Sequence, residues 1–157
     1  MERVPMTAVG FNGMQEELKN LKSVERPNVI KAIAEAREHG DLSENAEYHA
    51  ARERQSFIEG RVLELEDRIS RAEVIDPSKL SGKTVMFGAT IILVDEDSDE
   101  EVTYQIVGQY ESDITKGLLS ITAPLARALI GKRVGDQVEV VTPGGSKSYE
   151  ILKIDYK

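Results

Sequence analysis

The sequence predicts an α+β protein with two domains, a helical hairpin over residues 1–75 and a small β-rich domain with one helix over residues 76–157. Two observations lead to this prediction. In the first part, apolar residues recur at spacings of three and four, which is the period of an amphipathic helix. In the second part, short runs rich in β-branched residues alternate with turn residues, which is typical of a sheet.

The first helix is expected to begin after Thr7, which is a good capping residue, and to end at Gly40. Pro27 removes a backbone donor inside this span, so we expect a kink or a brief break there before the helix resumes. The apolar stripe ahead of the proline has spacings of three, four and three and consists of Phe11, Met14, Leu18 and Leu21.

The second helix is expected from Leu42 or Ser43 to about Ala72, because its apolar residues fit one heptad frame. Two such helices joined by a few residues bury their stripes by folding back on each other as an antiparallel coiled coil. The residues in this frame are Ala51, Ile58, Val62, Leu65, Ile69 and Ala72.

The β-rich domain contains six runs that we expect to be strands and one segment, residues 124–130, that we expect to be a helix with Pro124 in its first turn. The acidic stretch 95–101 and the turn at 143–145 are predicted to be loops. The six strand runs are residues 84–87, 89–94, 102–107, 118–121, 138–141 and 149–154.

Composition excludes several classes of function. The net charge of −8 at pH 7 argues against a protein that grips free nucleic acid by its phosphates, so weak or no independent nucleic-acid binding is expected. No apolar run approaches the roughly 20 residues that cross a bilayer, and no apolar secretory signal opens the chain, so we expect a cytoplasmic protein without a membrane partner. The absence of cysteine excludes a disulfide framework and a Cys-based zinc site.

Asp41 and Glu44 are the candidate chemical groups, and two interpretations of them are open. An Asp followed three residues later by Glu at a helix start forms a capping box, in which both side chains satisfy free amides of the first turn. Alternatively, two exposed carboxylates supply part of a site for Mg²⁺, which prefers hard oxygen ligands. Two carboxylates do not complete such a site, so the second interpretation requires ligands from a partner.

Residues 32–53, which include Glu35-Ala36-Arg37-Glu38-His39-Gly40-Asp41-Leu42-Ser43-Glu44-Asn45, resemble the hairpin tip of the Gre family of bacterial transcript-cleavage factors. Segments 74–76, 87–90, 98–104 and 123–131 extend the resemblance over nearly the whole chain. It implies an elongation factor whose coiled coil enters the secondary channel of RNA polymerase. There the factor would stimulate the polymerase's own cleavage of the nascent RNA 3′ end in backtracked complexes, and so act as an activator rather than an enzyme.

The resemblance also implies roles for individual residues. Asp41 and Glu44 match the family's metal-assisting acids, which hold Mg²⁺ only together with polymerase, so binding by the free protein is expected to be weak or absent. Pro124, Leu125 and Arg127 match the segment that docks on polymerase, in a domain expected to be FKBP-like.

Three arginines near the tip, Arg37, Arg52 and Arg54, are candidate contacts for RNA phosphates, although surface arginines commonly pair with neighbours such as Glu38 or Glu53. The small basic patch and the acidic total favour the less basic branch of the family, which releases short fragments. Two alternatives keep the same fold. One is an inhibitory channel-binding or chaperone-like coiled coil, and the other is a prolyl isomerase, which the scarcity of aromatic residues disfavours.

Overall fold

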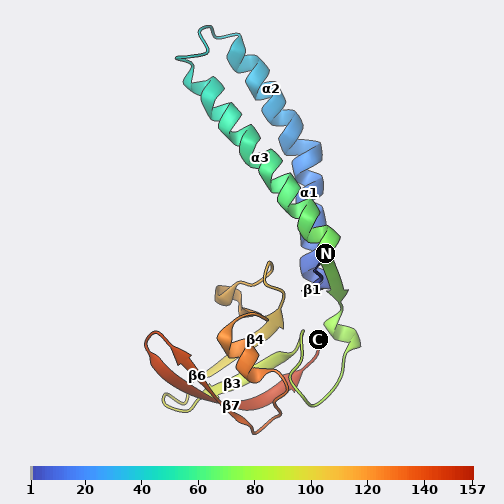
Figure 1. The fold of residues 1–157 in the computed structure, drawn as a ribbon, viewed down its shortest axis with the longest axis vertical. Coiled ribbons are helices and arrows are strands. Elements are labelled where there is room, and N and C mark those ends of the chain that lie inside the picture. Colours follow the sequence, from blue (N-terminus) through green and yellow to red (C-terminus); the bar gives the residue numbers. More distant parts are fainter. Residues whose placement is uncertain (1) are drawn as a thin grey trace. The chain divides into compact units, whose positions relative to one another are not determined.

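The computed structural model describes residues 2–157, and the chain divides into two compact units (Figure 1). The first unit contains Phe11–Ala72 and is a helical hairpin. The second combines Arg3–Gly10 with Glu73–Lys157 and contains a five-stranded sheet. The α+β fold class predicted from the sequence is therefore confirmed, while the two domains with the bounds 1–75 and 76–157 stay a prediction.

The first arm of the hairpin runs through α1 (Ala8–Asn20), a π-helical turn η1 (Leu21–Glu25) and α2 (Arg26–Arg37). The predicted cap is present, since the N–H of Gly10 donates to Oγ1 of Thr7 at 3.1 Å. The arm therefore begins where the sequence indicated.

The irregularity expected near Pro27 takes the form of the π turn rather than a break. The N–H of Arg26 donates to the carbonyl of Leu21, five residues back, in place of the usual four. Pro27 has no N–H, and its ring crowds the preceding turn of an ordinary α-helix. A single wider turn just before the proline relieves that crowding and lets the helix continue.

The second arm is α3 (Ala46–Arg71), so the expected start at residue 42 or 43 was wrong. Asn45 is the residue that caps this helix, because its backbone is extended and its side chain accepts the N–H of Tyr48. Residues 38–45 therefore form the connection between the arms (Figure 1).

The two arms pack through the predicted apolar stripes. The most buried position on α3 is Leu65, which is 0% exposed, and each buried aliphatic side chain of this kind stabilises the hairpin by about 1.5–3 kcal/mol. The buried residues of the hairpin are Met14, Leu21, Val29, Ile33, Ala36, Ile58, Val62 and Leu65.

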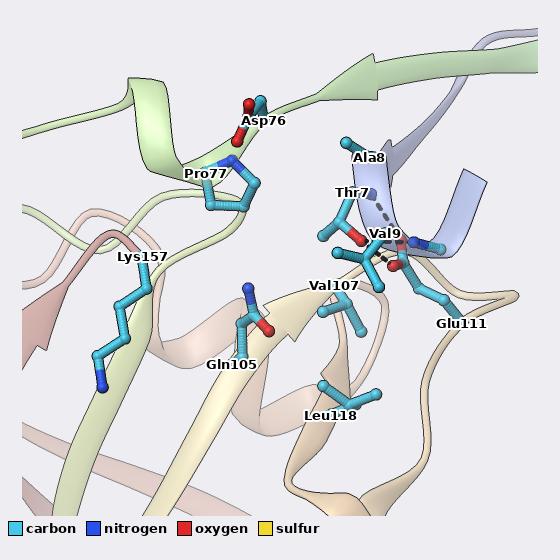
Figure 2. Close-up of a pocket in the computed structure, with 11 residues that line it drawn as sticks. Thr7, Ala8, Val9, Asp76, Pro77, Gln105, Val107, Glu111, Leu118 and Lys157 are labelled. Carbon is cyan, nitrogen blue, oxygen red and sulfur yellow. Dashed lines mark hydrogen bonds between the residues drawn. The ribbon is translucent and has the colours of Figure 1, made fainter. Parts of the chain in front are cut away.

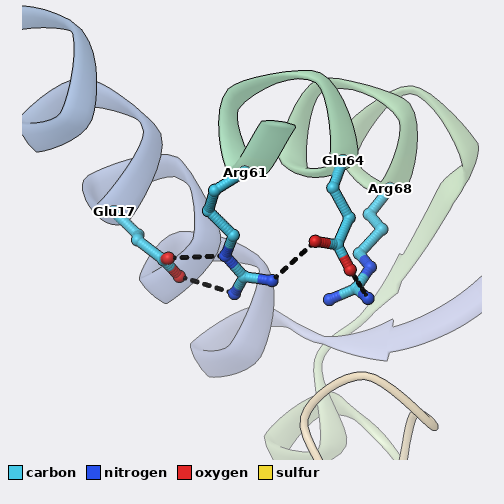
Figure 3. Close-up of polar contacts among 4 residues, drawn as sticks. All are labelled: Glu17, Arg61, Glu64 and Arg68. Atoms are coloured by element: carbon cyan, nitrogen blue, oxygen red, sulfur yellow. Dashed lines mark hydrogen bonds and ion pairs between the residues drawn. The ribbon is translucent and has the colours of Figure 1, made fainter. Parts of the chain in front are cut away.

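Ion pairs between the arms flank this apolar seam. Figure 3 shows Arg61 of α3 donating to both carboxylate oxygens of Glu17 on α1, at 2.7 and 2.9 Å. Arg61 also lies 3.3 Å from Glu64, which in turn pairs with Arg68. Pairs of this kind contribute little stability individually, but opposite charges across the seam favour one register of the two arms.

Two short strands, β1 (Val4–Thr7) and β2 (Ala72–Ile75), pair in a sheet of their own. Neither strand was predicted from the sequence, because neither four-residue segment has the alternation that marks a longer strand. Residues 77–79 and 114–116 form 3₁₀ turns, η2 and η3.

The larger sheet has the strand order β5-β4-β3-β7-β6. Strands β3, β4, β7 and β6 pair antiparallel, whereas β4 and β5 pair parallel. Residues 84–87 do not form the strand expected there, since only Thr84 makes a bridge, with Arg133. The strands are β3 (Thr90–Asp95), β4 (Glu101–Val107), β5 (Leu118–Ser120), β6 (Gln137–Thr142) and β7 (Gly145–Asp155).

The core of this unit lies between the sheet and the short helix α4 (Pro124–Leu129), which contributes Ala126 and Leu129. These two residues pack with inward side chains of the strands, including Ile91 and Ile151, all of them 0% exposed. No helix within residues 2–157 combines the length and the apolar character that a membrane crossing requires.

A carboxylate of the second unit holds the segment from which α1 starts. Glu111 accepts the backbone N–H of Thr7 at 2.8 Å and also its hydroxyl (Figure 2). It accepts the N–H of Gly108 at 2.9 Å as well. Beside this network lies a cavity of about 250 Å³ whose apolar walls include Val107 and Leu118. The backbone N–H and the hydroxyl of Thr7 are both satisfied there, which explains how this residue is only 4% exposed.

Candidate functional site

The turn between the arms exposes both candidate acids. Asp41 folds back on its own backbone, where one oxygen, Oδ1, accepts the N–H of Ser43 at 3.0 Å and its hydroxyl at 2.8 Å. These bonds hold the pKa of Asp41 below its ordinary value, first through the Ser43 hydroxyl and then through the Ser43 amide. The second oxygen, Oδ2, has no hydrogen-bond partner among residues 2–157, and the side chain lies at the surface.

Glu44 is exposed as well, and it precedes the first turn of α3. The capping-box interpretation of Asp41 and Glu44 is therefore contradicted, because both residues lie outside the helix and Asn45 occupies the cap. Within the described part of the chain, the carboxylate of Glu44 makes no hydrogen bond or ion pair. Neither acid is used to satisfy the free amides of α3.

Asn45 ties the two arms together at this end. Its Oδ1 accepts the N–H of Tyr48 at 3.0 Å, and its Nδ2 donates to the carbonyl of Ala36 at 2.6 Å. One side chain thus caps the start of α3 and satisfies a carbonyl at the end of α2. The turn that carries the acids is consequently fixed at both of its ends.

A tyrosine lies between two of the candidate arginines. The guanidinium carbons of Arg37 and Arg52 lie 5.8 and 5.9 Å from the ring centroid of Tyr48, within the range of cation–π attraction. Arg52 also donates to the Tyr48 hydroxyl at 3.0 Å. The two cations, Arg37 first and Arg52 second, lower the pKa of Tyr48 from its ordinary value because they stabilise the phenolate.

The arginines of the hairpin differ in whether a carboxylate neutralises them. Arg54, the third candidate for RNA contact, pairs with Glu25 of the other arm. Arg37 and Arg52 have no carboxylate within ion-pair distance in residues 2–157, and neither pairs with Glu38 or Glu53. The remaining arginines between residues 8 and 71 that pair with a carboxylate are Arg26, Arg61, Arg68 and Arg71.

The two histidines near the turn do not face one another as a ligand pair. Nε2 of His39 lies 3.8 Å from Glu47, and Nε2 of His49 lies 3.3 Å from the carbonyl of Ser43. No group of three or more His, Asp or Glu side chains in residues 2–157 is placed to hold a metal ion. The candidate metal ligands at the turn are the carboxylates of Asp41 and Glu44, which fit part of the all-oxygen shell of Mg²⁺.

The docking candidates lie in the second unit, on α4. Pro124 is the first residue of this helix, and both it and Arg127 are exposed. Leu125 differs, because it is half-buried and packs against the core of the sheet. Only Pro124 and Arg127 therefore offer their side chains fully to a partner.

The position of Tyr48 beside two arginines was not predicted from the sequence. The spacing of four residues between Tyr48 and Arg52 places these side chains on one face of a helix and was a usable signal. The contact with Arg37 comes from the other arm, so it depends on the register of the hairpin and has no local signature.

Comparison with known proteins gives matches along nearly the whole chain. Residues 4–74 match the family profile "Transcription elongation factor, N-terminal", and residues 80–156 match "Transcription elongation factor, GreA/GreB, C-term". The chain is 68% identical over 156 residues to the transcription elongation factor GreA of Paracoccus denitrificans, covering 99% of each chain. It is 69% identical to that of Ruegeria pomeroyi, again over 99% of each chain.

Solved structures with similar sequences cover the same length. The GreA factor homolog 1 of Thermus thermophilus is 27% identical, with 98% of this chain and 99% of that one covered and a TM-score of 0.45. The GreA/GreB factor of Nitrosomonas europaea is 23% identical, with 98% and 100% covered and a TM-score of 0.43.

Proposed function

The chain belongs to the GreA/GreB family of transcription elongation factors, and from this premise we propose how its residues act on RNA polymerase. The hairpin enters the secondary channel of a backtracked polymerase and brings its turn to the displaced 3′ end of the RNA. The polymerase then cleaves the RNA, a short 3′ fragment leaves, and elongation resumes. The protein works where the polymerase works, in the cytoplasm.

The observation that carries this proposal is the exposure of Asp41 and Glu44 in a turn whose helix cap is supplied by Asn45. Carboxylates that capped α3 would be held by backbone amides and unavailable to another molecule. Here Oδ2 of Asp41 and both oxygens of Glu44 remain available, so the turn presents hard oxygen ligands at the end of a long arm.

Asp41 and Glu44 would hold Mg²⁺ together with acidic residues of the polymerase. When bound, the ion supplies charge stabilisation for phosphodiester hydrolysis and lowers the pKa of a coordinated water. The residues of this chain contribute negative charge and position. Because two carboxylates leave most of a six-coordinate shell unfilled, the free protein should hold Mg²⁺ only weakly.

Arg37 and Arg52 would contact phosphates of the displaced RNA. Their positive charge is not neutralised by a neighbouring carboxylate, whereas that of Arg54 is shared with Glu25. Guanidinium groups fit phosphate oxygens with paired hydrogen bonds, which gives position without sequence preference. We assign Arg54 mainly to holding the arms together.

Pro124 and Arg127 would form the contact that holds the second unit on the polymerase, with Leu125 supporting them from beneath. Docking and chemistry then reside in different units. This division makes the protein an activator of the polymerase's own cleavage rather than an enzyme, because the substrate and most metal ligands belong to the polymerase.

The test uses a stalled, backtracked elongation complex with RNA labelled at its 3′ end. We expect short 3′ fragments when the protein is added and none when it is incubated with the same free RNA. Cleavage of free RNA would contradict the activator role. Slowed RNA synthesis without fragments would instead support the inhibitory alternative with the same fold.

A further inference from the structure

We propose that Tyr48 is a positioning residue that holds the guanidinium groups of Arg37 and Arg52 together as one surface for RNA phosphates. This inference rests on the proposed function and adds a residue to it. Tyr48 would not contact the RNA. It would act through the two arginines, one from each arm.

The geometry supports this role directly. Tyr48 and Arg52 lie on α3 and Arg37 lies at the end of α2, so the ring joins the arms close to the turn. The guanidinium carbons are 5.8 and 5.9 Å from the ring centroid, and Arg52 also donates to the hydroxyl at 3.0 Å. The same two arginines line one groove of about 250 Å³ between the arms, together with Gln55. The guanidinium groups of Arg37 and Arg52 therefore lie in the same region of the surface.

Two like charges that share a groove repel each other, so an arrangement of this kind needs something to offset the repulsion. The other arginines of the hairpin that pair do so with carboxylates, which would cancel the charge needed for RNA. A tyrosine ring attracts cations through its negative face and carries no charge at neutral pH. Tyr48 thus holds the two arginines in place and leaves their net charge intact.

A direct contact between Tyr48 and an RNA base is the competing explanation. An aromatic ring that stacks on a base needs a free face. The ring of Tyr48 is partly buried, lies beside two guanidinium groups and contacts His49 edge to face, with centroids 5.6 Å apart. These neighbours favour the positioning role.

The first experiment needs no polymerase and tests the Tyr48–arginine contacts in solution. The ¹³C signal of the Tyr48 ring carbon that bears the hydroxyl is followed against pH and identified by its loss in Tyr48→Phe. We expect a pKa below the ordinary 10.0, and a rise toward it in Arg37→Gln and in Arg52→Gln. Phe57→Leu, which removes a 71% exposed ring from the same helix, should leave the value unchanged. If neither arginine substitution changed the pKa of Tyr48, the proposal would be overturned.

The second experiment measures binding to elongation complexes with and without backtracked RNA. Tyr48→Leu should weaken binding to the backtracked complex by about five- to thirtyfold, the loss expected from two exposed cation–π contacts. Tyr48→Phe keeps the ring and should recover most of the affinity. Binding to the complex without displaced RNA should change little in either variant, and Phe57→Leu serves as the control in both assays. Helical circular dichroism checks that each variant is folded.

A double-mutant cycle separates positioning from direct contact. In a background of Arg37→Gln with Arg52→Gln, Tyr48→Leu should cause no further loss, because nothing remains for the ring to position. A loss as large as in the wild type would show that Tyr48 itself contacts RNA and would overturn the inference. If the wild type had no preference for backtracked complexes, the proposed function would fail. If the wild type preferred backtracked complexes and Tyr48→Leu kept that preference unchanged, only the proposed role of Tyr48 would fail.

Discussion

At the scale of single residues, the turn keeps its acids available because other side chains satisfy the backbone. Asn45 caps α3 and reaches the carbonyl of Ala36, while Ser43 fixes the direction of Asp41 through one oxygen only. The second oxygen of Asp41 and the whole carboxylate of Glu44 are left for a partner. The local geometry therefore orients Asp41 and neutralises neither acid.

The Asp41–Ser43 contact predicts a specific pH dependence. The bonds to Ser43 stabilise the charged form of Asp41, so its pKa is lower in the folded state than in the unfolded one. These bonds therefore stabilise the folded state at pH values above the ordinary pKa of 3.8, and this stabilisation is lost as the pH falls through the folded pKa. Ser43→Ala should raise the pKa of Asp41 toward 3.8, as read from its carboxyl ¹³C signal in the presence of a chelator.

Asp76 provides an internal control, since Ser78 lowers its pKa through the same pair of bonds in the other unit. Its titration should not change in Ser43→Ala. If the pKa of Asp41 were equally unaffected, Ser43 would not orient the carboxylate.

The resemblance to the Gre tip drew attention to Asp41 and Glu44, but the sequence did not settle which residue caps α3. Asp41, Ser43 and Asn45 all suit a cap position. The choice depends on where the first arm ends, since Asn45 alone of the three bonds the carbonyl of Ala36. Local propensity allows any of the three residues to cap α3, and the contact between the two arms selects Asn45.

At the scale of elements, the hairpin depends on one buried stripe along α3. Leu65 is 0% exposed, whereas Leu63 on the same helix is 70% exposed. Leu65→Ala should reduce the free energy of unfolding of the hairpin by about 2–5 kcal/mol, because it removes buried methyl groups and leaves a cavity. Thermal or urea denaturation followed by helical circular dichroism measures this loss.

The matched variant is Leu63→Ala, which removes the same atoms from an exposed site. It should change the free energy of unfolding by no more than about 0.5 kcal/mol. Equal effects of the two substitutions would contradict the packing of the arms through this stripe.

The heptad spacing on α3 predicted the hairpin because burial there follows a simple period. The same method did not yield the π turn before Pro27, since the sequence indicates where a helix is strained but not how it adjusts. Strands β1 and β2 escaped detection for a different reason. Each owes its existence to pairing with the other, which is more than 60 residues away in the chain.

At the scale of the whole molecule, the proposed function assigns contact with polymerase and chemistry to separate units. A net charge of −8 argues against tight binding of nucleic acid by this chain alone, so the proposed RNA contact would be local and supported by docking. The resemblance to the Gre family places Leu125 in the docking surface together with Pro124 and Arg127. Its packing against the core means that a charge there would disturb the fold as well as the interface.

Replacing the two exposed residues Pro124 and Arg127 by Glu should therefore weaken competition for polymerase by about tenfold or more, the loss typical of an interface arginine. The sheet should remain folded, because neither side chain is buried. Lys116→Glu, a charge reversal on another exposed element of the same unit, is the control. Unchanged competition by the Pro124 and Arg127 variant would remove this face of α4 from the interface.

The participation of Asp41 and Glu44 in RNA cleavage is tested by the rate at which backtracked complexes are cleaved when Asp41→Asn with Glu44→Gln replaces the wild type, across a Mg²⁺ titration. The amides keep the size of the side chains and the acceptor for Ser43 but lose the charge that retains the ion. We predict that stimulated cleavage falls by well over tenfold at every Mg²⁺ concentration, or more than about 1.4 kcal/mol in activation free energy, while binding to polymerase stays nearly intact. If the double variant stimulated cleavage at the wild-type rate across the titration, Asp41 and Glu44 would have no part in the reaction.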